Sequence, residues 1–296
     1  MLKVVDVSHW FGTKRVLNHV DFEISDGQIV SLVGPSGCGK STLLRAILGT
    51  HPPSEGRIWA DDMQVKRPSR HVGIVYQSYT LYSYMTAREN VAFGLMLDQT
   101  NLRFRVLHYL AWRKLRARHL DQADDLLKRV QLGHAADLYP YEMSGGMRQR
   151  VAIAQALIMN PKLLLLDEPF GALDEATRED LQLMLLHLYE DNLTAQRNGQ
   201  EPPYTILIVT HELNEALYVA NRVLGLSQYH QDGQHGATIV YDKAAPVFRP
   251  HDARDFQQLE VQKEEIRSVV FDPKSIRHHG DYVSFWEDLR RQADAI

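Results

Sequence analysis

Cysteine is nearly absent from this sequence, which has only Cys38 among its 296 residues. A single thiol excludes an intramolecular disulfide and a cysteine zinc cluster, and it is typical of a protein in a reducing compartment. The sequence also lacks any apolar run of the ~18 residues that a membrane-spanning helix needs. Its first ten residues lack the apolar core and cleavage site of a secretory signal. We therefore expect a cytosolic chain, for which a separate subunit would have to span any membrane.

An excess of positive charge is lacking as well, since 33 Lys and Arg residues face 37 Asp and Glu residues. The formal net charge of −4 gives no reason to expect a nucleic-acid partner, which would need a local basic patch. No internal repeat is present. With 44% hydrophobic residues, the composition is that of a globular protein with one large domain or a domain plus an appendage.

Strand-like and helix-like segments alternate along the chain. Residues 2–11 and 16–24 alternate apolar and polar side chains, as half-buried strands do. Runs typical of further strands occupy residues 26–34, 71–77, 162–169 and 205–212. Apolar residues recur at helical spacing in residues 40–53, 86–97, 121–133, 145–161, 177–192 and 213–223. This order predicts an α/β fold with a parallel sheet covered by helices. Residues 196–203 are expected to form a surface loop, and residues 229–237 a hairpin turn.

A glycine-rich loop with a lysine lies between a predicted strand and a predicted helix. Its sequence GPSGCGKST comprises Gly34, Pro35, Ser36, Gly37, Cys38, Gly39, Lys40, Ser41 and Thr42. The pattern G-x-x-x-x-G-K-S is that of a phosphate-binding loop, in which backbone N–H groups and a helix N-terminus surround phosphate oxygens. Lysine would neutralise the β- and γ-phosphates, and the serine hydroxyl would bind Mg²⁺. Alone, the loop leaves a kinase, a GTPase, a helicase and a transport motor open.

Two acidic residues follow the four leucines of a second buried-strand pattern. Asp167 stands at the expected C-terminal tip of that strand, where a carboxylate can reach a Mg²⁺ ion beside the phosphate loop. The next residue, Glu168, suits the polarisation of an attacking water. Without the loop upstream, the same residues could simply be solvated acids that end a strand.

A second candidate anion site precedes the helix predicted after residue 144. Ser144, Gly145 and Gly146 put a hydroxyl N-cap and two glycines at its start, so its backbone N–H groups are open to a phosphate. One chain has no evident use for two such helix starts on one nucleotide. In a dimer, however, each copy could close its second site on the nucleotide held by the other.

These motifs together resemble the nucleotide-binding subunit of an ABC transporter. The resemblance covers roughly residues 1–245 and rests on GPSGCGKST, VYQSYTLY, SGGMRQR, LLLLDEP, FGALD and IVTHE in that order. It implies a P-loop NTPase of the ABC ATPase type, with a RecA-like core and an N-terminal antiparallel β-subdomain. It also implies an inserted α-helical subdomain at about 78–160. Residues 246–296 then form a helical C-terminal extension.

The resemblance assigns nucleotide contacts to residues that would be unremarkable alone. Phe11 matches the aromatic residue that stacks on adenine, although the adjacent Trp10 could also serve. Gln77 matches the glutamine that contacts Mg²⁺ and water, senses the γ-phosphate and faces the membrane subunit. Asp174, otherwise an ordinary helix N-cap, matches the segment that crosses the dimer interface. His211 matches the histidine that holds the γ-phosphate and orients the attacking water.

The implied chemistry is the hydrolysis of ATP with Mg²⁺. Glu168 would be the general base or would orient the attacking water, while His211 and Lys40 would stabilise charge on the γ-phosphate. The metal contacts would come from Ser41, Gln77 and Asp167.

Two departures from the commonest signature, LSGGQ, lie at the start of the second anion site. Met143 replaces the leucine, a change that conserves shape, and Met147 replaces the glutamine and removes an amide. The sequence SGGMRQRVAIAQAL is similar to the signature of importers of the nitrate, sulfonate and taurine type.

A basic insertion at residues 99–120 makes the helical segment about a dozen residues longer than the resemblance implies. Aromatic residues are interleaved with its cations, which are Arg103, Arg105, Arg113, Lys114, Arg116 and Arg118. Two interpretations stay open: a longer solvated helix, or a contact with lipid headgroups or a cytoplasmic loop of a membrane subunit.

We therefore expect the ATPase subunit of a multi-subunit ABC importer at the cytoplasmic face of the bacterial inner membrane. Its partners would be a second ATP-binding subunit, expected to be an identical copy, a pair of permease subunits and, indirectly, a substrate-binding protein. Two alternatives remain: the ATPase of an exporter or lipid-trafficking system, or a soluble ABC ATPase of DNA repair, chromosome maintenance or translation.

Overall fold

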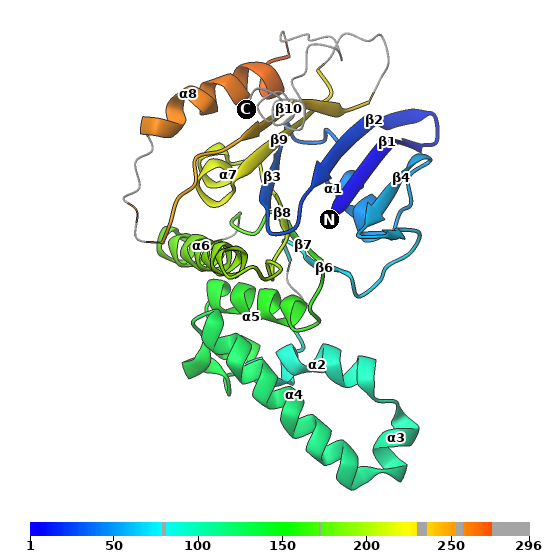
Figure 1. The fold of residues 1–296 in the computed structure, drawn as a ribbon, viewed down its shortest axis with the longest axis vertical. Helices are drawn as coiled ribbons and strands as arrows, with labels where there is room; N and C mark the ends of the chain where they lie inside the picture. Colours follow the sequence, from blue (N-terminus) through cyan, green and yellow to red (C-terminus); the bar gives the residue numbers. More distant parts are fainter. Residues whose placement is uncertain (79–80, 172, 230–235, 251, 253–256, 274–296) are drawn as a thin grey trace.

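A six-stranded sheet runs through the centre of the molecule (Figure 1). The computed structural model describes all residues except 79–80, 172, 230–235, 251, 253–256 and 274–296. The sheet has the order β10-β9-β3-β8-β7-β6, and its neighbouring strands are parallel except at β10. Its strands are β3 (Ile29–Val33), β6 (Val72–Val75), β7 (Leu163–Asp167), β8 (Ile206–Val209), β9 (Arg222–Ser227) and β10 (Thr238–Ala244).

The central strands are apolar at nearly every position because both faces of the sheet are covered, and the buried Ser31 of β3 is an exception. In β3, Ile29 and Val33 belong to one hydrophobic core, while Val30 and Leu32 belong to the other. The first core contains residues of the helical segments, and the second contains residues of α1 and the N-terminal strands. A strand with two buried faces favours apolar side chains at consecutive positions, which explains the four consecutive leucines of β7.

A second, four-stranded antiparallel sheet lies against the core on the α1 side. It has the order β2-β1-β4-β5, and its strands are β1 (Leu2–Phe11), β2 (Lys14–Ile24), β4 (Glu55–Ala60) and β5 (Met63–Gln64). Strands β1 and β2 were predicted from their alternating pattern. Strands β4 and β5 were not, because β4 is exposed over its first half and therefore has only a short apolar stretch.

The helices begin and end where local sequence signals indicate. Thr86 and Glu89 form a capping box at the start of α2, and Gly49 ends α1 in the left-handed conformation. The α-helices are α1 (Lys40–Leu48), α2 (Ala87–Gln99), α3 (Leu102–Leu107), α4 (Tyr109–Arg129), α5 (Gly145–Leu157), α6 (Glu175–Arg197), α7 (Leu213–Val219) and α8 (Gln257–Ile266). Short turns of other helix types lie at Gly133–Ala135, Pro140–Glu142 and Arg267–Phe271.

Helices α2 to α5 form a lobe that extends away from both sheets (Figure 1). We call this part, residues 87–157, the helical lobe. The two sheets and this lobe confirm the predicted α/β class with an antiparallel N-terminal sheet and an inserted helical part. None of the helices in the described ranges is long and apolar enough to cross a bilayer. The exact domain limits, 1–245 and 246–296, stay predictions.

Three segments differ in detail from the expectation or fall partly outside the description. Helix α6 continues to Arg197, so the loop predicted at 196–203 starts two residues later, where Gly199 turns the chain with φ 69°. The hairpin pairing of β9 with β10 is observed, although residues 230–235 of its turn lie outside the described residues. In the C-terminal extension α8 is present, and the rest of the predicted helical extension, residues 274–296, lies outside the described residues.

Candidate nucleotide-binding site

The phosphate loop joins the end of β3 to the start of α1, as its sequence predicts. A Cβ on Gly34 would lie 2.2 Å from the carbonyl oxygen of Leu226 in β9, so the loop can leave the sheet there only with glycine. Gly39 has φ 109°, a left-handed conformation that other residues rarely adopt, and no side chain caps the helix start after it. The first backbone N–H groups of α1 are therefore open to an anion.

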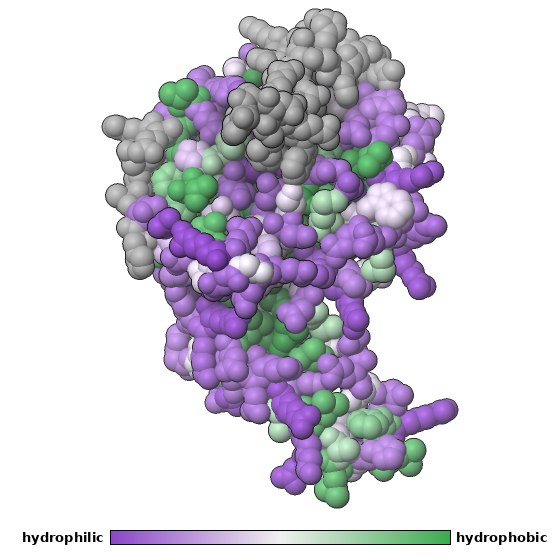
Figure 2. Space-filling model, in the orientation of Figure 1, coloured by the Kyte–Doolittle hydropathy of each residue, from purple (hydrophilic) through white to green (hydrophobic). Residues whose placement is uncertain are grey.

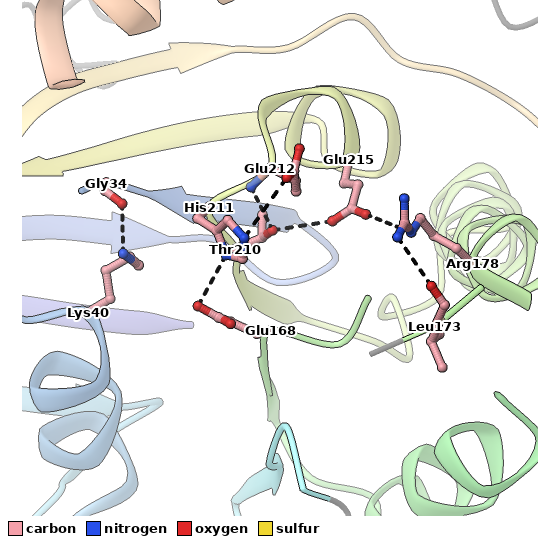
Figure 3. A network of polar contacts seen from close by, with 9 residues as sticks. All are labelled: Gly34, Lys40, Glu168, Leu173, Arg178, Thr210, His211, Glu212 and Glu215. Atoms are coloured by element: carbon pink, nitrogen blue, oxygen red, sulfur yellow. Dashed lines mark hydrogen bonds and ion pairs between the residues drawn. The ribbon is translucent and has the colours of Figure 1, made fainter. Parts of the chain in front are cut away.

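Lys40 is buried beneath the loop, and its ammonium is oriented by the loop itself. Its Nζ donates to the carbonyl oxygen of Gly34 at 2.7 Å (Figure 3) and to that of Pro35 at 3.0 Å. An ammonium has three N–H donors, so one remains for a phosphate oxygen.

The other loop side chains divide into exposed and buried ones. Ser36 and Ser41 are exposed, whereas Pro35 and Thr42 are half-buried. Cys38 is buried, and burial raises the pKa of its thiol. A protonated, buried thiol has no nucleophilic role. Cys38 can therefore offer the nucleotide its backbone only.

Oxygen ligands suited to Mg²⁺ come from the tips of neighbouring elements. Asp167 ends β7, Gln77 follows β6, and Ser41 lies in the first turn of α1. Burial is the largest cause that raises the pKa of Asp167, Glu168 adds to it, and Arg45 and Lys40 oppose it. Hard oxygen donors and a half-buried carboxylate match a Mg²⁺ ion, which typically keeps waters and substrate phosphates among its ligands. Among the described residues, no three His, Cys, Asp or Glu side chains form a metal cluster.

Glu168 and His211 come together at the C-terminal ends of the neighbouring parallel strands β7 and β8. Glu168 adopts φ 47°, which is uncommon for a residue with a side chain, and its N–H donates to the Val209 carbonyl at 2.8 Å. His211 Nδ1 lies 3.3 Å from Glu168 Oε1 (Figure 3). Residues held in such conformations cluster at functional sites. The strained backbone therefore turns the carboxylate toward the imidazole.

Gln77 lies beside the same carboxylate. A Cβ on Gly171 would lie 3.7 Å from Gln77 Nε2 and 3.8 Å from Glu168 Oε2, so both polar groups border this glycine. Gln77 itself is exposed. The structure thus brings together three of the predicted residues, Gln77, Glu168 and His211, from three different segments.

A partly buried chain of polar contacts behind His211 was not predicted. Thr210 Oγ1 donates to Glu215 Oε2 at 3.3 Å, and Glu215 Oε1 lies 3.3 Å from Arg178 Nε (Figure 3). Arg178 Nη2 in turn donates to the Leu173 carbonyl at 3.2 Å. The chain of contacts connects the segment after β8 with the residues that precede α6. The sequence gives no signal for these contacts, because Glu215 reads there as an ordinary acidic residue in the first turn of a helix.

Burial of Glu215 changes its titration. Its side chain is largely enclosed, and desolvation raises its pKa from 4.5 to about 7, although Arg178 opposes this shift. The Glu212 charge also raises this pKa, while Thr210 and His211 lower it.

The second anion site lies at the start of α5, next to the start of α6. Ser144 Oγ accepts the N–H of Met147 at 3.3 Å as an N-cap. A Cβ on Gly146 would lie 1.7 Å from the Thr177 methyl group, so the two helix starts touch. Asp174 caps α6 through the Thr177 N–H at 3.0 Å. Within the described part of the chain, no hydrogen bond or ion pair joins Ser144, Gly145 or Gly146 to the phosphate loop.

The two candidate adenine-stacking rings end β1. Phe11 is 49% exposed, and its ring contacts His9 edge-on at 4.8 Å. Trp10 is half-buried, and the Arg15 guanidinium lies 4.8 Å from its ring centroid. Since one face of Trp10 is already occupied, Phe11 is the ring more open to a base.

The order of these elements and the geometry of the loop agree with comparisons to known proteins. The family model for ABC transporters matches residues 17–171, more than half of the chain. The chain belongs to the ABC transporter family. It has the fold of the ATP-binding cassette, in which the phosphate loop, the second helix start and the strand-end histidine are all present.

The curated relatives of this ABC protein are named import ATP-binding proteins. The sulfate/thiosulfate import ATP-binding protein CysA of Nephroselmis olivacea is 40% identical over 83% of this chain and 65% of its own length. The protein of that name from Pseudomonas putida is 37% identical over 98% of this chain and 84% of its own length. The aliphatic sulfonates import ATP-binding protein SsuB of Bacillus thuringiensis is 34% identical over 88% of this chain and 96% of its own length. The chain spans just under two thirds of the length of two of the relatives, at 65% and 66%.

A solved structure supports the same family. The cassette MJ0796, solved as a dimer in a post-hydrolysis state bound to ADP and Pi, is 28% identical, with a TM-score of 0.62. The match covers 84% of this chain and all of that one. A nucleotide-free ABC transporter cassette at 23% identity and a TM-score of 0.67 shows the same fold.

Proposed function

We propose that this chain is the ATP-hydrolysing subunit of an ABC importer. The observation that carries the proposal is the contact of His211 Nδ1 with Glu168 Oε1 at 3.3 Å, at the sheet edge to which the phosphate loop also belongs. A carboxylate and an imidazole at this place can orient and deprotonate a water molecule that attacks a terminal phosphate. The names of the curated relatives favour import over the exporter and the non-transport alternatives.

Each site residue then has a stated part in hydrolysis. Glu168 is the general base, and Lys40 and His211 stabilise negative charge on the γ-phosphate. The remaining loop residues bind phosphate through their backbone, and Phe11 stacks on the adenine. Ser41, Gln77 and Asp167 would hold Mg²⁺, which neutralises phosphate charge when bound.

We further propose that the site is completed by a second copy of the chain. Because Ser144, Gly145 and Gly146 form no hydrogen bond or ion pair with their own phosphate loop among the described residues, they are available to the nucleotide of a partner. Asp174, which caps the adjacent α6, would lie at the boundary between the two copies. The dimeric state of the similar cassette MJ0796 supports this arrangement. The pair would bind permease subunits at the cytoplasmic face of the bacterial inner membrane, and act indirectly with a substrate-binding protein. We assign this ATPase part to residues 1–245, with the helical subdomain at about 78–160.

The test compares two carboxylates that lie near His211. Glu168→Gln should lower the turnover of ATP by about 100-fold or more, since general-base catalysis contributes on that scale. It should also leave ATP binding intact and trap a dimer on size-exclusion chromatography. The matched control is Glu212→Gln, because Glu212 Oε1 lies 3.9 Å from His211 Nε2. Turnover near the wild-type rate in Glu168→Gln would refute the assignment of the base.

The importer assignment needs its own measurement. The tagged Glu168→Gln chain, extracted from native membranes in the presence of ATP, should bring permease subunits with it. Recovery of the chain without membrane subunits would contradict the transport function while leaving the ATPase assignment intact.

A further inference from the structure

A segment with cations and no acidic residue forms the far end of the helical lobe. Residues 99–120 contain six Lys and Arg and no Asp or Glu, in a chain whose formal net charge is −4. The segment comprises α3, the bend at His108 and the first half of α4. Figure 1 places this end of the lobe away from both sheets. A strong local charge of one sign therefore lies far from the nucleotide site.

Apolar side chains are exposed at the same end, which excludes an ordinary solvated helix. None of the residues of α3 is buried. Their exposed fractions are high for apolar side chains: Leu102 76%, Val106 69%, Leu107 76%, Tyr109 56% and Leu110 75%. We call these five residues the apolar tip. Figure 2 shows hydrophobic side chains gathered there, next to strongly hydrophilic ones. Exposed apolar patches mark interaction sites in soluble proteins.

Two of the six cations serve the internal structure. Arg105 donates to Thr100 Oγ1 and to the Met96 carbonyl, both at 2.8 Å. Arg116 Nη2 pairs with Glu89 Oε1 at 2.9 Å. These two side chains hold α3 and α4 against α2.

The other four cations face solvent. We call Arg103, Arg113, Lys114 and Arg118 the basic collar. All four are exposed, and none has an ion pair with another described residue. On α4, Lys114 and Arg118 follow Leu110 at intervals of four residues and share one face of the helix. That face is apolar in its first turn and basic in the next two.

We propose that the apolar tip and the basic collar dock on an anionic lipid surface. Leucine and tyrosine at the end of a helix pair can enter the headgroup layer, while the cations behind them meet lipid phosphates. Charge complementarity selects this occupant, because the segment has positive charge without any acidic residue to pair with a mixed protein surface. A stable protein interface also involves about 20–30 residues a side, whereas the tip and collar together contain nine. The convex end of two helices therefore suits a planar surface better than a protein groove.

Binding to lipid can be measured on the purified full-length chain. Sedimentation with vesicles of phosphatidylcholine plus phosphatidylglycerol should recover the wild-type chain, whereas vesicles of phosphatidylcholine alone should not. Binding should weaken as salt concentration rises, because the attraction between exposed charges is screened. This measurement is independent of ATP hydrolysis, so it and the proposed function can fail separately.

Two sets of substitutions test the two halves of the surface. Arg103→Glu, Arg113→Glu and Lys114→Glu together should reduce the partition coefficient by on the order of 100-fold, since each cation contributes about fivefold near an anionic surface. Leu102→Ser, Leu107→Ser and Leu110→Ser together should also abolish recovery with the vesicles. The matched control reverses three exposed cations outside the helical lobe, Arg57 of β4 and Lys66 and Arg67 after β5, and should bind as wild type.

All three variants should keep the ATPase rate of the wild type in solution, which shows that they are folded. The proposal is overturned if the wild-type chain does not sediment with anionic vesicles, or if the charge-reversed chain sediments equally well. It is also overturned if the chain does not bind anionic vesicles and the variants are instead extracted from membranes without their membrane subunits. In that case the surface would be a contact with another protein.

Discussion

His211 Nδ1 lies 3.3 Å from Glu168 Oε1, although 43 residues separate them in the chain. The two residues follow β7 and β8, which are hydrogen-bonded neighbours in the parallel sheet. Parallel strands end at the same edge, so the sheet places the carboxylate and the imidazole together. Their contact is therefore a property of strand order.

This contact predicts that the two side chains act as one unit. His211→Ala and Glu168→Gln should each lower kcat strongly, and the double variant should be no slower than the slower single variant, because groups that act together are not additive. The measurement is kcat of the three variants at saturating ATP. His187→Ala, which alters a partly exposed histidine of α6 paired with Glu190 at 3.7 Å, should leave kcat unchanged. Multiplicative losses in the double variant would show that the residues act independently.

Glu215 predicts how stability depends on pH. Desolvation raises its pKa in the folded chain to about 7, above the ordinary 4.5, against the opposing charge of Arg178. The folded state therefore favours the protonated carboxyl, so this contribution to stability is fully present below pH 4.5 and is lost as pH rises through about 7. Its upper limit is about 3 kcal/mol, since each pKa unit corresponds to about 1.4 kcal/mol.

Thermal unfolding of Glu215→Gln should isolate the contribution of the Glu215 carboxyl to the pH dependence of stability. The amide cannot ionise, so the variant should lose less stability than the wild type between pH 5.5 and pH 8. Histidines titrate in both proteins, which makes the difference between their slopes the relevant quantity. Equal slopes would mean that Glu215 stays ionised in the folded chain, stabilised by Arg178.

The close approach of Gly146 to Thr177 predicts that a smaller residue at position 177 will restore stability lost by a larger one at position 146. Its Cβ position lies 1.7 Å from the Thr177 methyl carbon, so Gly146→Ala should strain the junction of α5 and α6 and cost about 1–3 kcal/mol in unfolding free energy. Thr177→Ser removes that methyl group and keeps the hydroxyl that bonds Asp174 Oδ2 at 2.8 Å.

The double variant should regain most of the stability lost by Gly146→Ala, as measured by urea unfolding. The single Thr177→Ser variant is the matched control and should be close to wild type. If Thr177→Ser gives no rescue, the loss comes from another contact of Gly146.

A buried ion pair predicts the largest stability effect. Arg222 Nε and Nη2 bond the two carboxylate oxygens of Asp242 at 2.7 and 2.6 Å, and both side chains are at most 1% exposed. Asp242→Asn removes the negative charge that this buried guanidinium faces, which should cost about 3–5 kcal/mol. The neighbouring, partly exposed pair of Lys243 and Glu265 offers a control, since Lys243→Gln should cost less than about 1 kcal/mol. Comparable losses in urea unfolding would contradict the difference expected from burial.

Much of the fold could be predicted because its signals are local. The apolar run of β7 marks a strand buried on both faces, and the glycines of the phosphate loop mark a turn before a helix. Weak local signals explain the misses. Strand β4 has a short apolar stretch, and α6 continues into a polar segment that was expected to be a loop.

The candidate site could be predicted residue by residue, but its geometry could not. The resemblance identified Glu168 and His211 as residues, while nothing local predicts the φ of 47° that turns the glutamate toward the imidazole. The contacts of Glu215 with Arg178 and of Arg222 with Asp242 join residues on different elements. No periodicity or motif encodes such pairs.

The basic insertion shows the same division. Its charge and helical character follow from its composition, and both interpretations of residues 99–120 were compatible with that composition. Packing against α2 then turns Arg105 and Arg116 inward and leaves Leu102, Leu107 and Leu110 in solvent. Residue order along the chain determines backbone preferences and motif chemistry, because these depend on near neighbours. Burial, exposure and the meeting of distant side chains depend on how the strands and helices pack, and so they appear only in the folded molecule.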